Sequence, residues 1–198
     1  MADTVFSSSV YHKMKQTFQL LLLLFFVVLF SKNTAFAQSN DLRLVFIRHA
    51  EKPVKGDNLT CQGLNRSRML PAVIVTKFGI PAFTFVPGLG LGDSTKHARM
   101  FQTVVPLAAK YNLAINSVHK QKDPMGLIAD LLTKNGTVLI AWEHSGIPAI
   151  IRALGISRDD LIWPDDDYDS IWMVTFKDGK PLFVKDKEGL KPGTECNF

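Results

Sequence analysis

Residues 42–52 have the sequence LRLVFIRHAEK. The first six are mostly apolar and include a β-branched pair, which is typical of a strand buried on both faces of a sheet. The segment then changes abruptly to arginine, histidine, acid and lysine. In an α/β protein the carboxyl end of such a strand lies at the mouth of the sheet, where ligands bind. Arg48 and His49 are therefore the first candidates for a chemical role.

Strands and helices are predicted to alternate along the rest of the chain. This alternation predicts one α/β domain over residues 38–198, a three-layer sandwich with a mostly parallel sheet flanked by helices. A hairpin at 170–184 is expected at the edge of the sheet. The patterns predict strands at 42–47, 82–86, 113–118 and 137–142 and helices at 60–78, 95–111, 123–134 and 147–154.

Local signals mark where two of these helices begin. Thr60 is expected to cap the first helix, and Pro71 is expected to bend or split it. The second helix is expected to be capped by one of three polar residues, Asp93, Ser94 or Thr95. The short glycine-rich segment at 88–92 is predicted to be a flexible loop, because it lacks the spacing of a phosphate-binding GxGxxG or GxxxxGK[ST] motif.

Residues 1–37 have the features of a secretory signal peptide. An unbroken apolar run at 20–30 follows a basic flank at 12–15 and precedes the small-x-small sequence Ala-Phe-Ala, after which cleavage is expected. The run is shorter than the roughly 20 residues that span a bilayer. We therefore expect a secreted or periplasmic protein. An uncleaved membrane anchor is the alternative, and Met14 is an alternative start to Met1.

The charge balance limits the classes of partner. The chain carries 23 Lys and Arg residues against 18 Asp and Glu residues, a formal net charge of +5, and the basic residues are scattered. A nucleic-acid partner is therefore not indicated. A mild positive balance suits a small anionic substrate. The sequence predicts no oligomeric state.

The chain has only two cysteines, Cys61 and Cys196. Export would permit a disulfide between them, which would hold the C-terminal tail against the first helix. Two unpaired thiols are the alternative, because spacing alone does not show that the sulfur atoms meet.

Two histidines follow the two most apolar strands. His49 ends the first of these strands, and His144 follows the strand at 137–142. Parallel strands end at the same edge of a sheet, so both imidazoles are expected to share a pocket. Arg48 adjoins the first histidine, and Arg99 lies in the second helix. Two guanidiniums and two imidazoles suit a phosphoryl group, because arginine binds its oxygens bidentately and histidine can attack or donate a proton.

Two other kinds of site fit less well. Each histidine has at most one acid nearby, Glu51 or Glu143, there is no HExxH motif, and the adjacent arginine would repel a cation. The sequence EHSG at 143–146 is not the GxSxG turn of a serine hydrolase. No metal and no cofactor are therefore expected.

Four segments in order carry a resemblance to a known family. They are RHAEK at 48–52, LTCQGLNRS at 59–67, TKHARMFQT at 95–103, and residues 138–154 centred on the sequence HSGIP. They resemble the RHG/RHAE, LTxxGxxRA, S/TxxxRAxQT and second-histidine segments of the histidine phosphatase superfamily. The superfamily includes the cofactor-dependent phosphoglycerate mutases and many phosphomonoesterases. Serine replaces the last alanine of the second motif, and Met100 replaces alanine in the third.

The resemblance implies a role for each matching residue. His49 would be the nucleophile that forms a phosphohistidine, while Arg48, Arg99 and His144 would hold the transferring oxygens. No metal would be required. The implied function is hydrolysis of an unidentified phosphomonoester that is small or exposed. A phosphate- or carbohydrate-binding module without turnover is the alternative, and a phosphomutase is a further one that export disfavours.

The resemblance does not identify the proton donor. Relatives place an acid directly after the second histidine, where this chain has Ser145, or in the segment after the third strand, where Asp123 fits. Glu143 also adjoins His144, but neighbours on a strand point to opposite faces. Glu51 is expected to fix its loop by pairing with Lys52 or Arg66. Asp123 is the preferred donor from the sequence.

Substrate specificity is expected to come from loops at the mouth of the sheet. Aromatic residues near them are able to stack on a sugar or base, although core packing is the commoner role of such residues. The loops are 53–58, 87–97, 119–125 and 163–170, and the aromatic residues are Trp142, Trp163, Tyr168 and Trp172.

Overall fold

The computed structural model of the chain describes residues 11–20, 41–90 and 95–196. The chain divides into two units, Met1–Ala37 and Gln38–Phe198, and residues 11–20 of the first unit are helical. Most of the apolar run and the expected cleavage site lie outside the described residues. Within the described ranges, none of the helices combines the length and apolar character needed to cross a bilayer.

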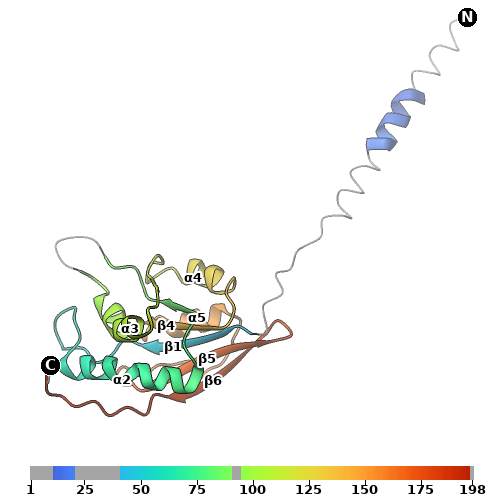
Figure 1. The fold of residues 1–198 in the computed structure, drawn as a ribbon. Helices are drawn as coiled ribbons and strands as arrows, with labels where there is room; N and C mark the ends of the chain where they lie inside the picture. The colour runs from blue at the N-terminus through green and yellow to red at the C-terminus, as the bar shows by residue number, and fades with distance from the viewer. Residues whose placement is uncertain (1–10, 21–40, 91–94, 197–198) are drawn as a thin grey trace, which may run out of the picture. The chain divides into compact units, whose positions relative to one another are not determined.

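One mixed sheet forms the centre of the second unit (Figure 1). Its strand order is β3-β2-β4-β1-β5-β6. The first four strands in this order run parallel, while β5 is antiparallel to β1 and forms a hairpin with β6. The predicted α/β class, the mostly parallel sheet and the hairpin at its edge are confirmed. The strands are β1 (Arg43–Arg48), β2 (Phe83–Phe85), β3 (Ile115–Asn116), β4 (Thr137–Trp142), β5 (Ser170–Lys177) and β6 (Lys180–Lys187).

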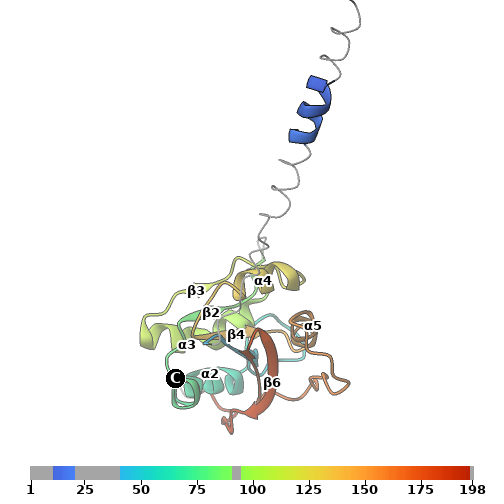
Figure 2. The same ribbon diagram turned by 90° about the vertical axis from the view of Figure 1, so that its right-hand side faces the viewer.

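Helices cover both faces of this sheet (Figure 2). Alternate residues of β1 point to opposite faces. Val45 and Ile47 belong to the core under α2 (Cys61–Phe78) and α3 (Ala98–Tyr111). Leu44 and Phe46 belong to the core under α4 (Pro124–Leu131) and α5 (Ile147–Ala153). The central strand is thus buried on both faces, which explains its continuous apolar sequence.

The start of α2 follows the prediction, but the start of α3 does not. Thr60 caps α2 by accepting a hydrogen bond from the Gly63 amide, and the helix continues past Pro71 without being split. The helix α3 begins only at Ala98, after His97 in the left-handed conformation and without a side-chain cap. The expected cap at Thr95 is therefore wrong, because a β-bridge between Gly90 and Lys96 positions the chain instead. Asp93 and Ser94 lie outside the described residues.

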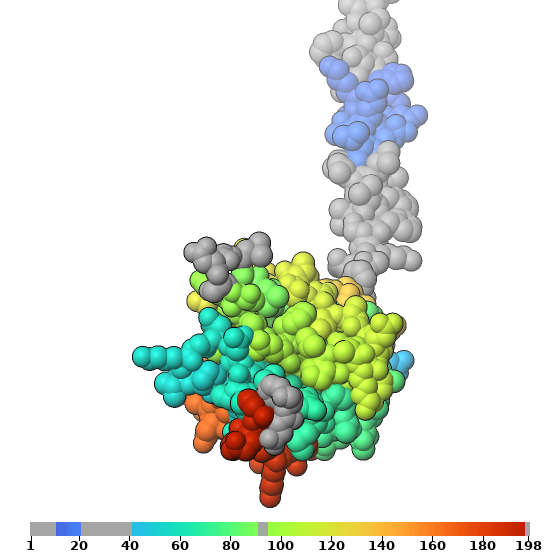
Figure 3. All heavy atoms as spheres, turned by 60° about the vertical axis from the view of Figure 1, so that its left-hand side comes forward, coloured from blue at the N-terminus to red at the C-terminus, as the bar shows by residue number. Residues whose placement is uncertain are grey.

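A disulfide joins the start of α2 to the C-terminal segment of this unit. Cys61, the first residue of α2, is bonded to Cys196, with their Cα atoms 4.9 Å apart. The Asn65 side chain also donates hydrogen bonds to the carbonyls of Gly193 and Glu195, at 2.9 and 2.8 Å. In Figure 3 the C-terminal residues accordingly lie against the first turns of α2. The sequence left the pairing open, and the structure forms it.

Replacing both cysteines by serine is expected to lower the free energy of unfolding by about 2–4 kcal/mol, because the crosslink restricts a long loop in the unfolded chain. The bonded residues are 135 positions apart. Urea denaturation measures the effect. Dithiothreitol should shift the wild-type midpoint to that of the Cys61→Ser/Cys196→Ser variant and leave the variant unchanged. Equal midpoints for the variant and the oxidised wild type would contradict the prediction.

Candidate active site

His49 lies at the carboxyl end of the central strand with its imidazole orientation fixed. Its amide donates to the Trp142 carbonyl at 3.1 Å, which extends the pairing of β1 with β4 by one residue. Its side-chain Nδ1 lies 2.7 Å from the Ala50 carbonyl oxygen. A carbonyl only accepts hydrogen bonds, so Nδ1 carries the proton and Nε2 keeps its lone pair. The Ala50 amide is held in turn by the Thr103 hydroxyl on α3, at 2.9 Å.

The surroundings of His49 keep its imidazole neutral. Burial lowers the pKa of His49 to about 3. The Ala50 hydrogen bond opposes this shift, and the electrostatic effect of Arg48, Arg99 and His144 reinforces it. A neutral imidazole with a free Nε2 lone pair is the form that attacks an electrophile.

Arg48 is buried beside the loop that follows α5. Its Nη1 donates to three main-chain carbonyls, those of Pro164, Asp165 and Asp167. Its guanidinium carbon also lies 3.9 Å from the centre of the Tyr168 ring. This loop therefore fixes the orientation of the guanidinium plane. Its Nε and Nη2 atoms are left buried without a partner among the described residues.

Arg99 and His144 approach from other elements. Arg99, in the first turn of α3, donates from Nη1 to the Gly56 carbonyl at 2.9 Å, and its Nε is buried without a described partner. The His144 Nε2 lies 2.7 Å from a carboxylate oxygen of Asp165, while its Nδ1 is buried and also unpartnered.

A small cavity connects these elements. Its volume is about 230 Å³, and both His49 and Arg99 line it. Arg48 and His144 do not line it, but both lie near enough to affect the charge state of His49. The structure thus brings the four predicted residues to one edge of the sheet. The other residues that line this His49 cavity are Asp57, Lys96, His97, Met100, Gln121 and Glu143.

Unsatisfied polar atoms concentrate at this edge. In the described part of the chain, five buried side-chain nitrogen or oxygen atoms have no hydrogen-bond partner, and four of them belong to Arg48, Arg99 and His144. An unpaired buried donor costs about 1–3 kcal/mol, so such atoms are rare in folded proteins. Their concentration beside the His49 lone pair indicates a site for an anion with several acceptor oxygens, such as a phosphoryl group.

Glu143 lines the same cavity as His49. Strand alternation alone does not decide where its side chain points, because β4 ends at Trp142 and Glu143 lies beyond it. The Glu143 carbonyl already accepts hydrogen bonds from the Gly146 and Ile147 amides in the turn that leads to α5. The chain has therefore left the sheet at this residue.

The other two candidate donors are engaged elsewhere. The Asp123 carboxylate accepts a hydrogen bond from the Gly126 amide at 2.9 Å and caps α4. Asp123 does not line the His49 cavity, so its role as the preferred donor stays a prediction. The Glu51 carboxylate accepts from Nε and Nη2 of Arg66 at 2.9 to 3.0 Å. Glu51 therefore pairs with Arg66, one of its two expected partners.

Arg66 connects the loop that follows His49 to the segment after β6. Its Nη1 donates to Glu188 at 2.6 Å and lies 3.7 Å from Asp169, so one buried guanidinium serves three carboxylates. Burial raises the pKa of Glu188 to about 7, although Arg66 opposes this shift, and the negative charges of Asp169 and Glu51 add to it. No local sequence signal marks Glu188, because its partners are distant along the chain.

The aromatic residues differ from one another in their environments. Trp142, Trp163 and Trp172 are at most 4% exposed and belong to the core, which excludes them as stacking surfaces for a ligand. Tyr168 instead covers the Arg48 guanidinium, with its ring 6.2 Å from that of His49.

No family model and no curated protein sequence matches the chain. Solved structures do match its fold. A protein assigned as the phosphohistidine phosphatase SixA of Agrobacterium tumefaciens superposes with a TM-score of 0.55 at 17% identity, over 78% of this chain and all of that one. The mycobacterial glucosyl-3-phosphoglycerate phosphatase gives a TM-score of 0.54 at 12% identity, over 73% and 97% of the two chains.

A third match is the phosphoserine phosphatase of Entamoeba histolytica in complex with 3-phosphoglyceric acid. It gives a TM-score of 0.53 at 13% identity, over 75% of this chain and 98% of that one. These identities are too low to transfer an activity, but the superpositions cover nearly the whole length of each matched protein. The chain therefore has the fold of the histidine phosphatase superfamily.

Proposed function

We propose that the protein is a phosphomonoester hydrolase that works through a phosphohistidine on His49. The observation that carries the proposal is the neutral His49 imidazole, whose lone pair on Nε2 lies beside a group of unpaired buried donors. The matched phosphatase folds support the same class of reaction.

The reaction would take place in two transfers. His49 Nε2 attacks phosphorus in line, a nitrogen–phosphorus bond forms, and the bond from phosphorus to the ester oxygen breaks. Arg48 and Arg99 hold the other phosphoryl oxygens with guanidinium donors that are otherwise unpaired, and a protonated His144 would add a donor at Nδ1. Water then attacks the phosphohistidine and releases inorganic phosphate. We propose that protein cations supply the charge stabilisation without a metal.

Glu143 is the proposed proton donor to the leaving oxygen. Its position in the lining of the His49 cavity supports this role. The same carboxyl group would take a proton from the attacking water in the second transfer.

Replacing Glu143 by glutamine is expected to slow hydrolysis of an alkyl phosphate by about 10²–10⁴-fold. Hydrolysis of p-nitrophenyl phosphate should slow much less, because nitrophenolate leaves without protonation. Steady-state kcat for the two substrates measures the difference. Asp123→Asn is the matched control, since that carboxylate caps α4. A larger selective loss in the Asp123 variant would assign the donor to Asp123.

The proposed function is tested by incubating the purified protein with p-nitrophenyl phosphate in the presence of EDTA. We expect release of inorganic phosphate. We also expect a phosphorylated form of the protein whose phosphate is acid-labile and stable to base. Binding of phosphate without release would identify a binding module. Transfer to a second hydroxyl without free phosphate would identify a mutase.

We also propose that the protein is exported after cleavage following Ala37, and that its substrate is a small phosphate ester outside the cytoplasm. The basic and apolar order of residues 12–37 supports this proposal. The disulfide supports it too, because such bonds persist in oxidising compartments. N-terminal sequencing of the mature protein tests it, and a first residue other than Gln38 or a near neighbour would contradict it.

A further inference from the structure

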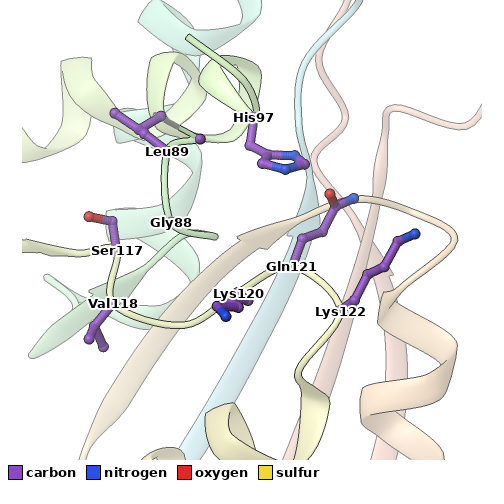
Figure 4. Close-up of a pocket in the computed structure, with 9 residues that line it drawn as sticks. Gly88, Leu89, His97, Ser117, Val118, Lys120, Gln121 and Lys122 are labelled. Atoms are coloured by element: carbon purple, nitrogen blue, oxygen red, sulfur yellow. The ribbon is translucent and has the colours of Figure 1, made fainter. Parts of the chain in front are cut away.

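A second, larger cavity adjoins the His49 cavity. Its volume is about 770 Å³, and it lies between residues 88–90, which follow β2, and residues 117–122, which lead from β3 toward α4. The two cavities share His97 and Gln121. In Figure 4 these two side chains lie close together at one end of this side cavity. A ligand longer than a phosphoryl group would pass His97 and Gln121 to reach the side cavity.

The side cavity has a positive lining. Lys120 and Lys122 line it together with His97, and no acid is among its described lining residues. Neither lysine takes part in an ion pair within the described ranges. Within these ranges their charge is therefore not neutralised, and it attracts an anionic group.

The backbone that carries the two lysines is held in place. The His119 carbonyl accepts from the Gly88 amide at 2.7 Å, and the Gln121 carbonyl accepts from the Trp142 indole at 3.3 Å. The His119 ring lies 2.9 Å from the Asp130 carboxylate on α4. The lysines therefore extend from a positioned segment, which lowers the cost of ordering them around a ligand.

The direction of the leaving group connects the two cavities. Gln121 lines the His49 cavity, the side cavity and a third cavity that contains Glu143 and Lys122. A leaving group protonated by Glu143 would therefore lie on the side of Gln121, toward the two lysines that line the neighbouring cavities.

We propose that the side cavity binds a second anionic group of the substrate, so that the substrate is a phosphate ester whose leaving group carries a carboxylate or a second phosphate. This inference rests on the proposed phosphatase function. It names the class of substrate that the same site takes.

The test compares pairs of esters that differ in the second anion. Phosphoglycolate is paired with ethyl phosphate, and 1,3-propanediol bisphosphate is paired with 3-hydroxypropyl phosphate. For each pair the measured quantity is the ratio of kcat/KM for the charged ester to kcat/KM for the neutral one. A charge-assisted contact stabilises by about 1.5–3 kcal/mol, so the ratio for at least one pair should fall about tenfold or more in the Lys120→Gln/Lys122→Gln variant.

Two matched variants complete the design. Lys120→Arg/Lys122→Arg keeps both charges and should keep most of the ratio. Retention would show that the positive charge sets the ratio, and not the particular packing of the lysine side chains. Lys177→Gln removes an exposed lysine on β5, in the hairpin on the other side of the sheet from β2 and β3, and should leave the ratio unchanged. The wild-type ratio should also decrease at high salt.

The results for the two ester pairs distinguish the proposed substrate class from the phosphatase function itself. A fall confined to the first pair identifies a carboxylate, and one confined to the second identifies a phosphate. If the wild type hydrolyses p-nitrophenyl phosphate but the glutamine variant keeps both ratios, the side-cavity inference is wrong and the phosphatase function stands. If the wild type hydrolyses neither the aryl phosphate nor any of the four esters, the phosphatase function fails, and this inference fails with it.

Discussion

The His49→Ala variant is expected to lose a factor of about 10⁴ or more in kcat for p-nitrophenyl phosphate, since removal of a nucleophile leaves only the contribution of the remaining site. In the His49 ring, Nδ1 is committed to the Ala50 carbonyl, so Nε2 is the only nitrogen of that ring left to attack. The measurement is steady-state phosphate release at enzyme concentrations high enough to detect the residual rate.

Two controls separate a lost nucleophile from a lost fold. The variant should retain binding of inorganic phosphate by calorimetry, because Arg48 and Arg99 keep their unpaired donors. It should also fail to take up label from a ³²P-phosphate ester, whereas the wild type becomes labelled. Wild-type turnover in the variant would remove His49 from the mechanism.

The Arg66→Met variant is expected to lose about 3–5 kcal/mol of unfolding free energy, which is the usual cost of leaving a buried charge without its partner. Arg66 is 5% exposed, and its guanidinium binds Glu51 and Glu188, both of which are also buried. Urea denaturation at neutral pH measures the loss. The triple variant Arg66→Met/Glu51→Gln/Glu188→Gln should regain much of it, because no buried charge is then left unpaired. Equal stability of the single and triple variants would contradict this explanation.

The pH profile of the same cluster provides an independent check. The pKa of Glu188 is raised from 4.5 to about 7 in the folded protein, so the folded state binds a proton that the unfolded state has released over this interval. The contribution of Glu188 to stability is therefore fully present below about pH 4.5 and is lost as the pH rises to about 7. Glu188→Gln should remove this part of the wild-type pH dependence.

The strongest sequence signals in this chain are local. The apolar runs predicted β1 and β4 to within a residue, because a strand buried on both faces has an uninterrupted apolar sequence. The same runs placed Arg48, His49 and His144 at one edge of the sheet, since parallel strands end together. Thr60 was also recognisable as a cap, because its partner, Gly63, is only three residues away.

Features that depend on distant segments left little local signal. Glu188 meets Arg66 only after the hairpin folds back, and Tyr168 covers Arg48 from a loop more than a hundred residues away. Asp123 was preferred as donor for its place in the segment after the third strand, and strand alternation disfavoured Glu143. Which carboxylate faces the His49 cavity depends on how separate loops meet there, and local sequence does not determine that.

The place of β1 in the sheet also has a consequence for synthesis and folding. The strand is made early, but its two neighbours are β4 and β5, at residues 137–142 and 170–177. During vectorial synthesis Arg48 and His49 would therefore emerge long before the strands that complete their surroundings, and an apolar strand would wait unpaired until then. β1 also lies outside the loop closed by Cys61 and Cys196. We expect the disulfide to hold β4 and β5 within a closed loop while β1 remains free to insert last. His49, the proposed nucleophile, would then be among the first residues made and among the last to reach its site.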